Sequence, residues 1–157
     1  MGFEGRIGRV CGTGIERASA VDFERRHVTR DRIYRSPVMS IQTVARQFVE
    51  LCNQGKNFDV MRTMYAPDIV SVEGDGKETA GQTPVIQKSE RWGEANTIHG
   101  EKVRGPFFNG PDEFAVHFTF EVTPKATGKR VTIEEVGVYT VKGDKIVREQ
   151  FFMTGER

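Results

Sequence analysis

The stretch of sequence that decides the fold is Glu134-Glu-Val-Gly-Val-Tyr-Thr-Val-Lys-Gly-Asp-Lys-Ile-Val-Arg-Glu-Gln-Phe-Phe-Met153. Apolar and polar side chains alternate on both sides of Gly143-Asp144, a pair that favours a tight β-turn. The sequence therefore predicts a hairpin in which Lys142 opposes Lys145. Charged residues also stand among bulky apolar ones here, which indicates a cavity, an interface or a partner that offsets their desolvation.

The segments before this hairpin predict helices first and strands afterwards. Ser40 is a favourable N-cap for a first helix that Gly55 ends, a second short helix begins at Asn57 and reaches Tyr65, and a third begins at Thr83. The predicted strands cover residues 69–73, 98–108, 113–123, 130–141 and 145–153. This order predicts an α+β fold in which three N-terminal helices pack on one face of a curved antiparallel sheet.

The bulk composition excludes several classes of protein. The chain has 157 residues, 37% of them hydrophobic, and a formal net charge of +1. No apolar run approaches the roughly 20 residues that a membrane-spanning helix needs, so we expect no membrane partner. The two cysteines lie in unrelated contexts, no secretory signal is visible, and no ligand cluster or cofactor motif appears, so we expect a cytoplasmic protein without metal or cofactor.

The charge divides the chain into two parts. Residues 1–38 contain eight Arg, no Lys and five acidic residues, which gives +3, whereas residues 39–157 carry the remaining −2. We interpret residues 1–38 as a disordered Arg/Gly-rich leader or an upstream extension ahead of a start at Met39. Its five acidic residues argue against a transit peptide, and a nucleic-acid-binding arm is the less favoured alternative. Residues 39–157 form the predicted domain.

The order of elements resembles the nuclear transport factor 2-like superfamily, in its SnoaL-like and ketosteroid isomerase-like branch. The matching stretches are Phe48 to Gly55, Met64 to Glu73, the helix with Trp92, and Val138 to Glu149. The resemblance implies a cone-shaped α+β barrel with a pocket between helices and sheet, and a homodimer formed through the convex face. Because the fold hosts isomerases, cyclases, hydrolases and non-catalytic modules, it does not fix the function.

Paired without a bulge, the hairpin places Val138 opposite Glu149 and Val136 opposite Phe151. The resemblance implies that this face lines the pocket. The neighbouring strand has His117 on one face and a Phe stripe on the other, and the sequence leaves open which of the two faces the pocket. The predicted ligand-binding residues are Phe48, Tyr65, Trp92, His117, Glu134, Val136, Val138 and Phe151.

The chemistry of the related isomerases depends on a carboxylate base and two donors to a developing oxyanion. The resemblance places Glu73 at the position of the base, but puts Phe48 and Val138 where the two donors stand. The aspartate that related cyclases and epoxide hydrolases carry on the last strand corresponds to Phe151. These replacements make the family's known reactions unsuited to this chain, since losing one such donor costs about 10²–10³ in rate.

Two functions stay open from the sequence. The first is a SnoaL-like domain that binds a small hydrophobic molecule in an internal pocket. The second is a cofactor-free isomerase, cyclase or hydratase in which Glu73 and Glu149, with pKa values raised by burial, serve as general bases. A structural role is the competing interpretation for each: Glu149 could pair with Arg130 or Arg148, and Glu73 could cap the Gly-rich turn after its strand.

Overall fold

The computed structural model describes residues 39–154, which contain three helices and six strands. The helices are α1 (Ile41–Asn53), α2 (Asn57–Thr63) and α3 (Gln82–Ala95). The strands are β1 (Tyr65–Val72), β2 (Glu78–Ala80), β3 (Asn96–Asn109), β4 (Glu113–Pro124), β5 (Val131–Lys142) and β6 (Lys145–Met153). The interpretation of residues 1–38 as a leader lies outside the described residues.

The helices start where local sequence favours them. Ser40 caps α1, its Oγ accepting a hydrogen bond from the Thr43 amide at 3.3 Å. The N-cap position of α2 is Lys56, which makes no side-chain cap hydrogen bond, and the side-chain amide of Asn57, the first helical residue, donates to Glu101 on β3 at 2.6 Å. α3 follows Gly81, whose φ of +94° suits glycine, and Pro84 stands in its first turn.

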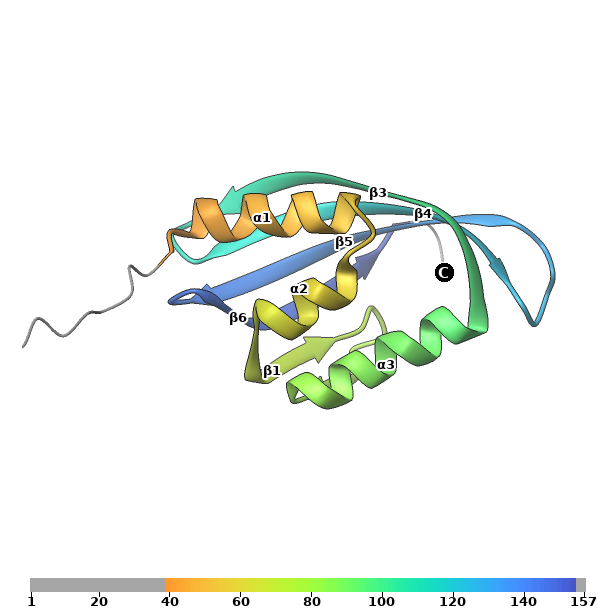
Figure 1. Cartoon of the computed structure of the whole chain (residues 1–157), viewed down its shortest axis with the longest axis horizontal. Helices are drawn as coiled ribbons and strands as arrows, with labels where there is room; N and C mark the ends of the chain where they lie inside the picture. The colour runs from red at the N-terminus through yellow and green to blue at the C-terminus, as the bar shows by residue number, and fades with distance from the viewer. Residues whose placement is uncertain (1–38, 155–157) are drawn as a thin grey trace, which may run out of the picture. The chain divides into compact units, whose positions relative to one another are not determined.

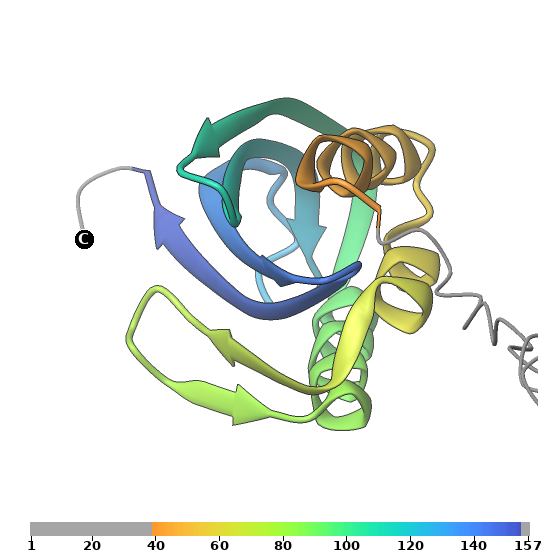
Figure 2. The same ribbon diagram turned by 90° about the vertical axis from the view of Figure 1, so that its left-hand side faces the viewer.

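The six strands form one curved sheet in the order β2-β1-β6-β5-β4-β3. Figure 1 shows the three helices gathered on one face, and Figure 2 shows the strands curling around that face. The α+β class and the helix-covered curved sheet are as predicted. The sheet is mixed rather than wholly antiparallel, because β1 runs parallel to β6, and it does not close. The short edge strand β2 was not predicted.

The hydrophobic core lies between α1 and the concave face of the sheet. Phe48 of α1 packs its ring 4.5 Å from Tyr139 of β5 and 5.5 Å from Phe114 of β4, measured between centroids. All three side chains are at most 2% exposed. Burial of aromatic rings in such offset contacts supplies a large share of the stability of a domain of this size.

A β-bulge in β6 sets the register of the hairpin. Lys142 opposes Lys145 as predicted, but Arg148 pairs with Thr140 while Ile146 pairs with Val141. Val147 is therefore an extra residue on β6, and beyond it every pair is shifted by one. Glu149 consequently opposes Tyr139 rather than Val138, so the predicted register of β5 is wrong. The odd-numbered residues of β5, from Ile133 to Val141, face the helices.

Candidate functional site

A cavity of about 470 Å³ lies beside the core, between α2, α3 and the concave face of the sheet. Most of its wall is aromatic or aliphatic, and a few polar groups converge on it. The aromatic members are Phe48, Phe58, Tyr65, Trp92, Phe118, Phe120, Tyr139 and Phe151, and the carboxyl groups are those of Glu73, Glu101, Glu135 and Glu149. Apolar cavities of this size with a few placed polar groups are typical of small-molecule sites.

Glu149 is the most deeply buried charged group of the described residues, at 1% exposed. The parallel pairing of β1 with β6 places Ser71 directly beside it, and both the Ser71 and the Tyr65 side chains hydrogen-bond to its carboxyl group. Burial raises the pKa of Glu149, and these two hydrogen bonds and the ammonium of Lys88 offset part of that rise. The carboxyl group is therefore held in one orientation by groups from one strand, β1, and one helix, α3.

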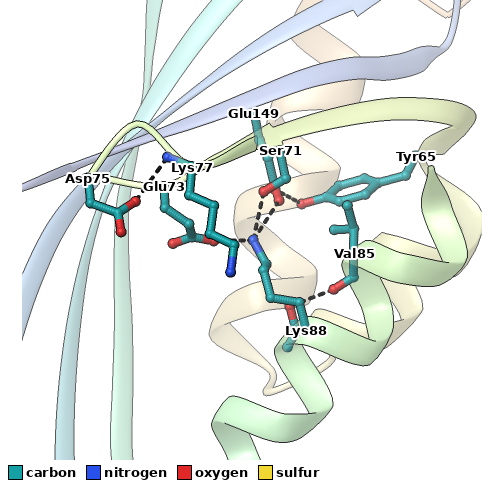
Figure 3. Close-up of polar contacts among 9 residues, drawn as sticks. Tyr65, Ser71, Glu73, Asp75, Lys77, Val85, Lys88 and Glu149 are labelled. Atoms are coloured by element: carbon teal, nitrogen blue, oxygen red, sulfur yellow. Dashed lines mark hydrogen bonds and ion pairs between the residues drawn. The ribbon is translucent and has the colours of Figure 1, made fainter. Parts of the chain in front are cut away.

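Lys88 of α3 connects the two predicted catalytic carboxylates. Its ammonium forms an ion pair with Glu73, donates to Ser71 Oγ at 2.7 Å and lies 3.9 Å from Glu149 Oε1. Figure 3 shows the lysine reaching from α3 toward these side chains. The same ammonium lies 5.5 Å from the centroid of the Phe151 ring, within the range of a cation–π contact. The local charge of the two carboxylates is thus partly neutralised by one cation.

Glu135 of β5 lines the same cavity but, unlike Glu73 and Glu149, is not held by neighbouring polar groups in the part of the chain that the structure describes. Within the described residues its carboxyl group forms no hydrogen bond and no ion pair. Burial raises its pKa to about 7, the carboxylates of Glu73 and Glu149 add to the rise, and Lys88 opposes it. A carboxyl group with such a pKa exchanges protons near neutral pH, which is the property required of a general base.

The structure brings six of the predicted site residues to the cavity: Phe48, Tyr65, Glu73, Trp92, Glu149 and Phe151. The other four, His117, Glu134, Val136 and Val138, lie on the opposite face of the sheet. There His117 opposes Val136 and contacts Arg104 at 3.1 Å, and Thr119 donates to Glu134 at 3.4 Å. The bulge at Val147 causes the three errors on β5, and the Phe stripe of β4, not His117, faces the cavity.

The sequence analysis missed several polar groups of the site, among them Ser71, Lys88, Glu101, Glu135 and Tyr139. Lys88 had a usable signal, because it stands three residues after Val85, which is fully buried, and so shares the inward face of α3. Glu135 and Tyr139 had no such signal in the sequence, because the bulge in β6 decides which face of β5 points toward the cavity. Among residues 39–154 no group of three or more His, Cys, Asp or Glu side chains is placed to hold a metal ion.

No helix in the described part of the chain is long and apolar enough to cross a membrane. The helices and the curved mixed sheet define the class of nuclear transport factor 2-like α+β proteins. A crystal structure from Cytophaga hutchinsonii in this class, of unknown function, is similar with a TM-score of 0.56 at 12% identity, over 71% of this chain and 96% of that one. This likeness concerns the fold alone.

The family follows from closer matches. The sequence model of the SnoaL-like domain matches residues 39–153, so the chain belongs to the SnoaL-like domain family. A Mesorhizobium loti protein provisionally assigned as a SnoaL-like polyketide cyclase is 46% identical, with a TM-score of 0.69 over 73% of this chain and 99% of that one. A protein of Jannaschia sp. with the same provisional assignment is 16% identical, with a TM-score of 0.60 over 76% and 90%. The search of curated proteins finds no match.

Proposed function

We propose that this SnoaL-like protein binds a small, largely apolar molecule in the cavity of about 470 Å³. The observation that carries the proposal is the combination of an aromatic wall with one buried and fixed carboxyl group, Glu149. The wall supplies the binding free energy by removing apolar surface from water, and the polar group orients the ligand. The provisional cyclase assignment of the 46% identical relative also supports a small-molecule ligand.

The test fills the cavity without altering its polar network. Ile133 lines the cavity, whereas Thr132, its neighbour on β5, is exposed on the other face. Binding of the neutral dye Nile red is followed by fluorescence in wild-type protein, Ile133→Trp and Thr132→Trp. We expect the first variant to weaken binding by about tenfold or more, since the indole occupies the space, and the second to bind as wild type. Equal binding in all three proteins would contradict the proposal.

Catalysis by proton transfer is the second candidate, favoured by the raised pKa values of Glu135 and Glu149 beside an apolar cavity. Glu73 is the weaker candidate for the base, because its carboxylate is paired with Lys88 and its side chain is 38% exposed. The readout is deuterium incorporation from D₂O into 2-tetralone, a compact ketone with acidic C–H bonds, followed by NMR. Exchange that falls in Glu149→Gln or Glu135→Gln supports an enzyme, and exchange no faster than in buffer opposes it.

A further inference from the structure

The interior of the cavity contains more acidic than basic groups. Four carboxyl groups line it, whereas Lys88 is the one cation of the described residues that lines it without being exposed. The other two lining cations, Lys77 and Arg91, are exposed to solvent. Lys88 is engaged by Glu73 and Ser71, and its effect on Glu135 is smaller than the effects of burial and of the Glu73 and Glu149 carboxylates. An added positive charge near Glu135 would therefore be favourable.

Aromatic side chains line the cavity wall on the strands beside Glu135 and on α3. Phe118 is its direct cross-strand partner on β4, and the Phe118 ring stacks on Phe120 at 5.5 Å. Trp92 continues this row, 5.6 Å from Phe120, and is 39% exposed, which places it toward the solvent side. Phe151 on β6 lies on the other side, opposite Gly137. A carboxylate among aromatic faces is the arrangement that proteins use to bind organic cations.

The cavity contains an internal example of the same recognition. The Lys88 ammonium lies against the Phe151 ring while it pairs with the Glu73 carboxylate. Glu135 offers the same two elements, a carboxyl group and neighbouring rings, but no cation of the described chain pairs with it. Within residues 39–154 the protein therefore supplies a cation, Lys88, for the Glu73 carboxylate but supplies none for Glu135.

We propose that the ligand of this cavity is an apolar amine, whose ammonium group lies beside Glu135 and against the rings of Trp92, Phe118 and Phe120. This inference rests on the proposed function, since it assigns a chemical class to the ligand of the same cavity. An ammonium ion gains both a charge pair and cation–π contacts there, whereas a neutral isostere gains neither and a carboxylate is repelled.

The affinity for a cation should depend on pH. The groups that face Glu135 are Glu73 just after β1, Lys88 from α3, Glu101 from β3, Glu149 from β6 and Tyr139 from its own strand. Because a bound ammonium stabilises the ionised form of Glu135, its affinity rises as the pH rises through about 7. Alkylammonium groups remain charged below about pH 10, so the ligand itself does not titrate in this range.

The test compares three compounds of one shape on the full chain: 1-adamantylamine, 1-adamantanol and 1-adamantanecarboxylate. Titration calorimetry at about pH 8.5 should show the amine binding at least about tenfold more tightly than the alcohol, and the carboxylate most weakly. The preference should shrink at about pH 5.5, where Glu135 is protonated. Glu135→Gln should abolish the preference for the amine over the alcohol, while Glu134→Gln, on the opposite face, should keep it.

Equal affinity for amine and alcohol, tighter binding of the carboxylate, or a preference that survives in Glu135→Gln would overturn the inference and leave the proposed function standing. If none of the three compounds binds and Nile red binding does not respond to Ile133→Trp, the proposed function fails and the inference fails with it. Should Glu135→Gln not fold, the pH profile of the wild-type protein decides by itself: a preference independent of pH contradicts the inference.

Discussion

Glu134 and Glu135 are neighbours in sequence but lie in different environments. Glu134 is exposed on the outer face of β5, whereas Glu135 faces the cavity, and burial raises its pKa to about 7. Since the folded-state pKa lies above the ordinary value of 4.5, the folded protein holds the proton more tightly than the unfolded chain. The associated stabilisation is complete below about pH 4.5 and is lost as the pH rises through about 7.

We therefore predict that Glu135→Gln is more stable than wild type at alkaline pH and equally stable at about pH 4.5. The difference should reach about 1–2 kcal/mol, because partial exposure of the carboxyl group reduces the effect of burial. Urea unfolding of wild type, Glu135→Gln and Glu134→Gln across this pH range checks it. A constant difference between Glu135→Gln and wild type at all pH values would contradict the assigned environment.

Sequence reasoning at this scale depended on the chemistry of each side chain. Glu149 was recognised because a charged residue stood among apolar ones in a half-buried strand. The sequence pattern could not show which residues contact Glu149. Its partners are Tyr65, Ser71 and Lys88 rather than Arg130 or Arg148, because β1 and α3 approach Glu149 through tertiary packing. Hydrogen-bond partners that are far apart in the chain leave no local pattern to detect.

At the scale of the element, the packing of β5 into the core requires a glycine at position 137. A Cβ added at Gly137 would lie 2.8 Å from the hydroxyl oxygen of Tyr139 and 2.9 Å from a carbon of its ring. The ring of Tyr139 thus occupies the space above Gly137, with Phe48 and Phe114 on its other sides. A larger residue at 137 would push this ring out of the core.

We predict that Gly137→Ala lowers the free energy of unfolding by about 1–3 kcal/mol, through overpacking against Tyr139. Gly100→Ala is the matched control in β3, since a Cβ there meets nothing within 4 Å. Chemical denaturation of both variants checks the prediction. A Gly137→Ala protein as stable as Gly100→Ala would show that the ring can move at no cost.

The bulge at Val147 explains why the sequence predicts where the strands lie along the chain better than which side of each strand faces the cavity. Alternation and turn residues located β3 to β6 within a few residues, and the turn at Gly143 was correct. An inserted residue in one strand leaves its apolar pattern nearly unchanged but shifts every pairing beyond it. The strand positions could therefore be predicted from the sequence, whereas the inward face of β5 could not.

At the scale of the whole molecule, the family match lies after residue 38. The family's sequence model begins at residue 39, and the 46% identical relative is covered over 99% of its own length by 73% of this chain. We predict that residues 39–157 fold alone with the unfolding free energy of the full chain, within about 0.5 kcal/mol. Denaturation of the two proteins side by side checks this, and a large loss of stability would show that residues 1–38 contribute to the fold.

The parallel pairing of β1 with β6 has a consequence for how the protein is made. It joins the start of the sheet to its last strand, and the hydrogen bond from Tyr65 to Glu149 spans 84 positions of the chain. Contacts between such distant segments form slowly, because a long loop must first close. Until β6 has been synthesised, β1 therefore lacks one of its two neighbouring strands, and Tyr65 and Ser71 lack the carboxyl group to which they hydrogen-bond in the folded protein.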